Sequence, residues 1–218
     1  MALLFLVRHG LTAQTGKVLY GRTPGISLDD RGRAQAEALA SRLAPTRPTA
    51  IYSSPLERCR QTVEPLAAAA RLEVHLRDEL IEMDAGGWTG RSLSQLRRSK
   101  HWSTVQKEPS AFRFPGDGES FVEAHARVVT EAERIARRHR RGRVVVATHG
   151  DLVRILLAHY AGVPLDGFQR FGADTASVSI VATDGGGRAQ VMLMNDTGDL
   201  DRFVPRPPRS RSTRKLRG

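Results

Sequence analysis

Two histidine–glycine pairs are the residues of this chain best placed to do chemistry. His9-Gly10 follows the apolar run ALLFLV (Ala2–Val7), and His149-Gly150 follows VVVAT (Val144–Thr148). Short runs of this kind, rich in branched residues, predict buried strands. Ligands of open α/β sheets bind outside the carboxyl ends of the strands, so both pairs should face one site. With Arg8 directly before His9, the pattern predicts a site for a phosphoryl group.

Phosphoryl transfer needs a nucleophile in line and positive groups around the phosphate oxygens. A neutral imidazole can be the nucleophile, and His9 is placed for this role. Arg8 can bind phosphate in bidentate fashion, and Arg58, predicted on the first turn of a helix, can reach the same edge. His149, protonated beside a phosphate, would stabilise its charge. Glu82 can protonate a leaving alkoxide, because a carboxyl group near a phosphate has a raised pKa.

Each of these residues alone has a common structural explanation. A single His-Gly pair is more often part of a loop, Arg58 could be a solvated helix arginine, and Glu82 could be a surface carboxylate. Their joint placement directly after strands favours a catalytic site. The sequence shows no spacing of His, Cys, Asp and Glu typical of a metal site, so we predict neither a metal nor a cofactor. Cys59 is predicted to be buried in a helix.

The predicted strands and helices alternate, which favours an α/β fold with a mainly parallel sheet covered on both faces. Besides the two runs above, strands are predicted at Thr49–Tyr52, Leu72–Leu76, Ser177–Ala182 and Ala189–Met194. Helices are predicted over about 29–43, 54–70, 92–100, 120–141 and 151–161. Ser54 is expected to cap its helix, with Pro55 at the first helical position. Ser120 and Glu123 form a capping box.

The length of 218 residues suits one domain, and we predict residues 1–204 as that domain. No apolar run approaches the roughly 20 residues that span a bilayer, and no signal peptide is evident. We therefore expect a cytoplasmic protein without membrane contact. Six of the net +11 charges lie in Pro205–Gly218, which we predict to be a disordered basic tail. Such a tail can touch nucleic acid, but a solvated tail without a partner is the more frequent case.

The motifs resemble those of the histidine phosphatase superfamily, in its phosphoglycerate-mutase-like branch. The resemblance extends to about residue 200 and rests on Leu6–Gly10, Gly32, Gln35-Ala36, Ser53–Thr62, Leu80–Gly90, Pro115–Ser120 and Thr148–Gly150. It implies a three-layer α/β/α sandwich and a phosphohistidine at His9. It also implies a phosphate pocket of Arg8, Arg58 and His149, Glu82 as the proton donor, and no metal.

Two positions depart from the family pattern. Thr15 stands where Asn is common, and Thr89 stands where Glu is frequent. Thr15 can still donate a hydrogen bond to phosphate, so we keep it, together with Gly150, among the predicted phosphate contacts.

The resemblance leaves the reaction open between hydrolysis and transfer. Similar mutases carry a longer insertion between the acid motif and the final histidine, whereas Glu82 and His149 are only 67 positions apart here. We therefore predict a metal-independent phosphomonoester hydrolase that acts on a small phosphorylated metabolite through a phosphohistidine. A cofactor-dependent phosphomutase is the alternative within the family. A non-catalytic protein that binds phosphoesters or nucleic acid is the alternative from another class.

The segment Gly90–Ser120 follows the acid motif and is expected to overhang the pocket. It carries more cations than acids, which predicts a positive rim that attracts acidic phosphate esters. The sequence identifies no dimer surface, and it leaves a homodimer open.

Overall fold

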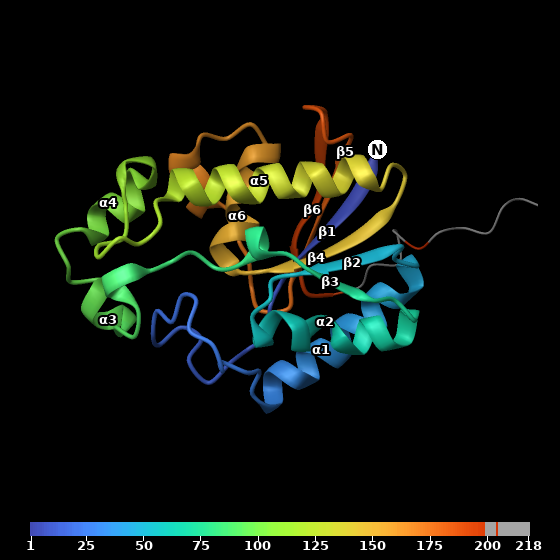
Figure 1. Cartoon of the computed structure of the whole chain (residues 1–218), viewed down its shortest axis with the longest axis horizontal. Coiled ribbons are helices and arrows are strands. Elements are labelled where there is room, and N and C mark those ends of the chain that lie inside the picture. Colours follow the sequence, from blue (N-terminus) through green and yellow to red (C-terminus); the bar gives the residue numbers. More distant parts are fainter. Residues whose placement is uncertain (199–203, 205–218) are drawn as a thin grey trace, which may run out of the picture.

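A six-stranded sheet forms the centre of the computed structural model, which describes residues 1–198 and Val204 (Figure 1). The strand order is β3-β2-β4-β1-β5-β6. The strands are β1 (Ala2–Arg8), β2 (Ala50–Ser53), β3 (Val74–Leu76), β4 (Arg143–Thr148), β5 (Val178–Thr183) and β6 (Ala189–Asp196). The first four are mutually parallel, whereas β5 pairs antiparallel with β1 and β6 pairs antiparallel with β5. The predicted mainly parallel sheet is confirmed.

Helices cover both faces of this sheet and complete the expected three layers (Figure 1). On one face lie α1 (Asp30–Leu43) and α2 (Glu57–Ala70), and on the other lie α5 (Phe121–Arg138) and α6 (Gly150–Tyr160). Two short helices, α3 (Leu93–Leu96) and α4 (Trp102–Lys107), lie beyond the carboxyl end of the parallel strands. Short 3-10 helices occupy Ala44–Thr46, Asp78–Leu80, Gly86–Trp88, Pro109–Ala111 and Leu165–Arg170.

Each face of the sheet contributes to its own hydrophobic core. Leu4 and Leu6 of β1 pack into the core under α5 and α6, whereas Phe5 and Val7 pack into the core under α1 and α2. Burial on both faces explains why β1 is a continuous apolar run rather than an alternating one.

The pairing of β1 with β4 decides where the functional residues meet. These strands are neighbours at the centre of the sheet, and Arg8 lies opposite Thr148 in the parallel register. His9 directly follows Arg8, and His149 directly follows Thr148. The backbone N–H of His9 donates to the carbonyl of Thr148 at 3.0 Å. Two histidines far apart in the sequence are thereby placed side by side at the carboxyl edge.

The helix predicted to have Ser54 as its cap and Pro55 as its first residue starts two residues later. α2 begins at Glu57, and its N-cap is Leu56. This residue has an extended backbone, and its apolar side chain accepts no capping hydrogen bond. The Ser54 hydroxyl instead lies 2.9 Å from Nε2 of His149. The prediction of a Ser54 cap was wrong because this buried hydroxyl binds a site residue.

Other helix limits also differ from the predictions. The helix expected over 92–100 is only α3, capped by Ser92, and α4 was not predicted. The capping box of Ser120 and Glu123 is confirmed at the start of α5. That helix ends at Arg138 rather than near residue 141, because the chain turns there, with Arg141 at a φ of 65°.

Gly32 provides a test of how closely α1 packs on the loop that follows His9. A Cβ atom on Gly32 would lie 2.0 Å from the carbonyl oxygen of Leu11. Alanine in a helix is ordinarily about 1 kcal/mol more favourable than glycine. Here we expect the opposite sign: Gly32→Ala should lower the free energy of unfolding by about 1–3 kcal/mol, as overpacking does, measured by urea titration.

The control is Ser41→Ala, which changes an exposed residue of the same helix and should leave the protein as stable as the wild type or slightly more so. A Gly32→Ala variant as stable as the wild type would contradict the close packing.

Candidate active site

His9 is held as a neutral imidazole with one defined ring nitrogen available. The side chain is 2% exposed, and Nδ1 lies 2.8 Å from the carbonyl oxygen of Gly10. Because a carbonyl only accepts, Nδ1 must carry the proton, which leaves the lone pair on Nε2. Burial, together with the nearby Arg58 charge, lowers the pKa of His9 to about 3. At neutral pH the ring is therefore uncharged and has the lone pair that a nucleophile needs.

Arg58 is completely buried and is only partly satisfied by protein groups. Nη2 donates to the carbonyl of Gly21 at 2.8 Å, and the guanidinium lies over the Tyr20 ring at 4.7 Å. Nε and Nη1 have no hydrogen-bond partner among the described residues. Buried donors of a charged group are almost always paired, so two orphaned nitrogens point to an anion as their partner.

Arg8 is partly satisfied in the same way. Nη1 donates to the carbonyl of Ala173 at 2.6 Å, whereas the buried Nε has no partner in the described chain. Gly150 packs against this guanidinium, since a Cβ there would lie 3.2 Å from Nε of Arg8. Gly150 is also the first residue of α6, where backbone N–H groups favour anions.

His149 is buried beside His9, with 5.3 Å between the ring centroids. Nε2 lies 2.9 Å from Oγ of Ser54 and 3.5 Å from Sγ of Cys59. Burial first, and then the positive charge of Arg58, lower the pKa of His149 well below its ordinary value. The protein alone therefore holds this ring neutral, and the protonated form expected from the sequence requires the charge of a bound phosphate.

Glu82 lies on the loop after β3 and points into the site. Oε2 is 3.6 Å from Nδ1 of His149, and Oε1 accepts a hydrogen bond from the backbone of Met83 at 2.9 Å. Burial, followed by the neighbouring charge of Asp151, raises the pKa of Glu82 to about 7. A carboxyl group of this pKa can donate a proton at neutral pH and take it back, as a general acid must.

A charged network outside the cavity anchors the loop of Glu82. The backbone carbonyl of Glu82 accepts from Nε of Arg22 at 2.8 Å and from Nη2 of Arg127 at 3.3 Å. Both arginines also bind Glu119, in part through a contact of 2.6 Å between Nε of Arg127 and Oε1. The sequence pointed to Glu119 through the Pro115–Ser120 motif, but it gave no signal for the two arginines.

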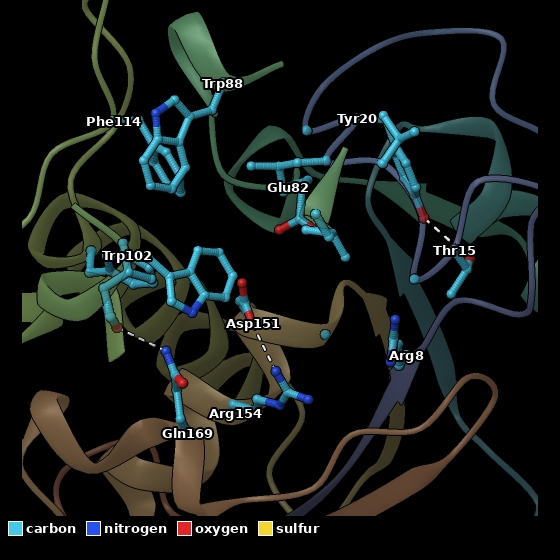
Figure 2. A pocket seen from close by; sticks show the side chains of 18 of the residues that line it. Arg8, Thr15, Tyr20, Glu82, Trp88, Trp102, Phe114, Asp151, Arg154 and Gln169 are labelled. Carbon is cyan, nitrogen blue, oxygen red and sulfur yellow. Dashed lines mark hydrogen bonds and ion pairs between the residues drawn. The ribbon is translucent and has the colours of Figure 1, made fainter. Parts of the chain in front are cut away.

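The residues predicted to form the site lie in and behind the wall of a cavity of about 350 Å³ (Figure 2). Five predicted residues line it: Arg8, His9, Thr15, Glu82 and Gly150. The other two, Arg58 and His149, are buried behind this lining. Thr15 lies beside Tyr20 in Figure 2, and its hydroxyl is already engaged by the backbone N–H of Thr12 at 3.1 Å. All predicted site residues are thus brought to one place.

The sequence missed several residues that line the cavity away from the phosphate-binding groups. They are chiefly Tyr20, Trp102, Asp151, Arg154 and Gln169. Only Asp151 carried a usable signal, since it directly follows the second His-Gly pair.

The segment Gly90–Ser120 contributes to the cavity in an unexpected way. Its lining residues are apolar or uncharged: Leu93, Trp102, Val105, Gln106 and Phe114. None of its arginines or lysines lines the cavity, and Arg113, for example, pairs with Glu123 instead. The expectation of a positive rim was therefore wrong: apolar side chains of this segment turn inward, while the charged ones face solvent or acidic partners.

Metal binding, membrane crossing and the state of Cys59 can each be read from the described residues. Residues 1–198 contain no group of three or more His, Cys, Asp or Glu side chains that could hold a metal ion. In the same range no helix has the length and apolar character needed to cross a bilayer. Cys59 is buried as predicted, and this burial raises its pKa to about 12, so the thiol is not a reactive thiolate.

Comparisons with known proteins agree with this geometry. The profile of the histidine phosphatase superfamily (branch 1) matches residues 4–197. The chain is 34% identical to phosphoserine phosphatase 1 of Hydrogenobacter thermophilus over 208 residues, covering 93% of this chain and 96% of that protein. It is also 34% identical to a metal-independent phosphoserine phosphatase of Arabidopsis thaliana, covering 70% of this chain and 66% of that protein. The structure of Bacillus stearothermophilus YhfR aligns with a TM-score of 0.82 at 26% identity, covering 93% and 100% of the two chains.

The chain belongs to the histidine phosphatase superfamily, branch 1. Within that family its phosphatase relatives identify it as a phosphoric monoester hydrolase, so the enzyme class predicted from the sequence is confirmed. The three-layer, phosphoglycerate mutase-like fold is confirmed as well.

The raised pKa of Glu82 gives a testable pH dependence of stability. A folded-state pKa near 7, above the ordinary value of about 4.3, means that folding favours the protonated acid. Wild-type stability should therefore fall as pH rises from about 4.5 to 7. The variant Glu82→Gln is neutral at every pH. We expect it to gain about 2 kcal/mol relative to the wild type between pH 5 and pH 8, since one pKa unit corresponds to about 1.4 kcal/mol.

Urea titrations at the two pH values measure this difference. Glu37→Gln, at an exposed position of α1, is the matched control and should differ from the wild type by the same amount at both. A pH-independent offset for Glu82→Gln would show that the carboxyl group is ionised well below pH 7.

Proposed function

We propose that this protein hydrolyses phosphate monoesters of small metabolites through a phosphohistidine on His9, without a metal. The observation that carries the proposal is the state of His9 beside a buried cation. Its Nε2 lone pair is available at neutral pH, and the adjacent Arg58 has two donors without a protein partner. A nucleophile and a preformed anion site next to it are the two requirements of phosphoryl transfer.

In the first step, Nε2 of His9 attacks phosphorus and forms an N–P bond while the P–O ester bond breaks. Arg8 and Arg58, with the N-terminal N–H groups of α6 at Gly150, bind the non-bridging oxygens. Glu82 donates its proton to the departing oxygen, which leaves as an alcohol. Negative charge on the phosphate raises the pKa of His149, so that this ring can donate a hydrogen bond to the phosphate.

In the second step, water attacks the phosphohistidine. Glu82, now a carboxylate, takes a proton from the water as the O–P bond forms and the N–P bond breaks. Inorganic phosphate leaves, and His9 returns to its neutral state with the proton on Nδ1. Thr15, whose hydroxyl lines the cavity beside Tyr20, is a phosphate contact in this scheme.

The relatives named above as phosphoserine phosphatases make phosphorylated amino acids the first substrates to test. A phosphorylated small molecule is thus the proposed partner. Cytoplasmic localisation, a homodimer and the single domain over residues 1–204 stay predictions, and the basic segment 205–218 lies outside the described residues.

Replacing His9 tests the nucleophile directly. His9→Ala should reduce release of inorganic phosphate from a panel of monoesters by at least about 10³-fold, because covalent catalysis is lost. The wild type should keep its activity in EDTA. His101→Ala, which removes an exposed histidine, should retain wild-type rates.

Equal phosphate release by His9→Ala and the wild type would refute the assignment of His9. Transfer of the phosphoryl group to an alcohol instead of water would identify a phosphomutase.

The role of Glu82 as proton donor can be tested with two esters that differ in their leaving group. Glu82→Gln should lower kcat/KM for an alkyl phosphate by about 10²–10⁴-fold, as expected for loss of a general acid. The loss for p-nitrophenyl phosphate should be much smaller, because nitrophenolate leaves without a proton. Equal losses for both esters would mean that Glu82 does not protonate the leaving group.

A further inference from the structure

Beyond the phosphate-binding residues, the cavity contains one pair of opposite charges that the proposed chemistry does not use. Asp151 and Arg154 both line the cavity, and Nη1 of Arg154 lies 3.1 Å from Oδ1 of Asp151. The side chains are 41% and 32% exposed, so each retains a surface toward the cavity. Figure 2 shows both on the side of Trp102, across from Thr15 and Tyr20.

The position of this pair is fixed relative to the phosphate site. Both residues belong to the first turns of α6, whose first residue, Gly150, packs on Arg8. The opposite face of the helix is anchored in the core by Leu152, Val153, Ile155 and Leu156, all fully buried. The backbone of Asp151 and Arg154 is therefore fixed next to Arg8, the proposed phosphate ligand, and such fixed placement is what recognition of the rest of a substrate requires.

The surroundings favour ionic recognition at this point. An ion pair three residues apart on a solvated helix contributes little to stability. This pair instead shares the cavity with Trp102, Val105 and Phe114, whose apolar surfaces strengthen electrostatic interactions. Nε of Arg154 is buried and has no partner among the described residues. The guanidinium therefore retains hydrogen-bonding capacity after its contact with Asp151.

We propose that Asp151 binds the ammonium group and Arg154 the carboxylate of a phosphorylated α-amino acid whose phosphate lies against His9. Both charged groups of such a substrate are attached to one carbon, so their receptors must be neighbours of opposite sign, as these two residues are. This assignment rests on the proposed phosphatase function and specifies its substrate class. Asp151 also raises the pKa of Glu82, so it has a second effect on the acid.

The test uses substrates that differ in one group at a time. L-Phosphoserine and 3-phosphoglycerate share the phosphate and the carboxylate and differ by ammonium against hydroxyl. Phosphoethanolamine keeps the ammonium and lacks the carboxylate. D-Phosphoserine has the same charges with the wrong handedness. We expect the wild type to prefer L-phosphoserine by about 10–100-fold in kcat/KM over each of the others, as charge-assisted contacts predict.

Two variants assign the groups. Asp151→Asn should reduce the preference for L-phosphoserine over 3-phosphoglycerate by about 10-fold or more. Arg154→Gln should reduce the preference for L-phosphoserine over phosphoethanolamine by a similar factor. Ratios at one pH cancel any change in the pKa of Glu82, because all these esters need the same acid. The control is Asp184→Asn, which breaks a comparable pair with Arg188 outside this cavity and should change neither ratio.

Three outcomes would overturn the assignment. The wild type could hydrolyse L-phosphoserine and 3-phosphoglycerate with the same kcat/KM. The substrate preferences could also be the same in Asp151→Asn and Arg154→Gln as in the wild type. The wild type could also hydrolyse p-nitrophenyl phosphate through His9 and none of the amino-acid esters, which would remove the subsite and leave the phosphatase function intact. Failure of the wild type on every monoester would instead refute the proposed function itself.

Discussion

The buried charge of Arg58 acts, together with burial itself, on the ionisation of the residues around it. A guanidinium that is shielded from water and only partly paired creates a strong positive field. Burial is the larger cause of the lowered pKa values of His9 and His149, that field adds to it, and the same field opposes the rise in the pKa of Glu82. The rings of the two histidines can therefore lie 5.3 Å apart, centroid to centroid, without charge repulsion, because the lowered pKa values keep both neutral.

The sheet supplies the geometry that this charge requires. Because β1 and β4 are parallel neighbours, both histidines reach the carboxyl edge at the same level. Strand β2, which pairs with β4, leads through Ser54 into α2, and α2 carries Arg58 to the same site as the two histidines. Ser54 and Cys59 of this connection contact His149, so the residues that introduce the cation also orient the second histidine.

Sequence reasoning found the groups that follow strands and missed those that depend on loop paths. His9, Arg58, Glu82 and His149 were predictable because a strand end fixes where the next residues lie. Tyr20, on the loop after β1, and Trp102, at the start of the unpredicted helix α4, were not, since no periodicity in these short or irregular segments indicates which side chains turn toward a cavity. Charge counting over 90–120 failed for the same reason, because composition does not tell which faces of α3 and α4 point inward. The start of α2 was missed because Ser54 fitted both a cap and a site residue.

The anchoring of the acid loop has a consequence for how this fold can vary. Arg22 and Arg127, joined through Glu119, hold the main chain at Glu82 from outside the cavity. Trp102 and Val105, on the far wall, lie on α4, which takes no part in these hydrogen bonds, whereas the backbone N–H of Phe114 donates to the carbonyl of Glu119. The loop of Glu82 and the part of the wall formed by α4 therefore have separate supports. Substitutions within α4 can remodel this part of the wall while Glu82, the proposed proton donor, keeps its place, so one catalytic framework can acquire new substrates through local exchange.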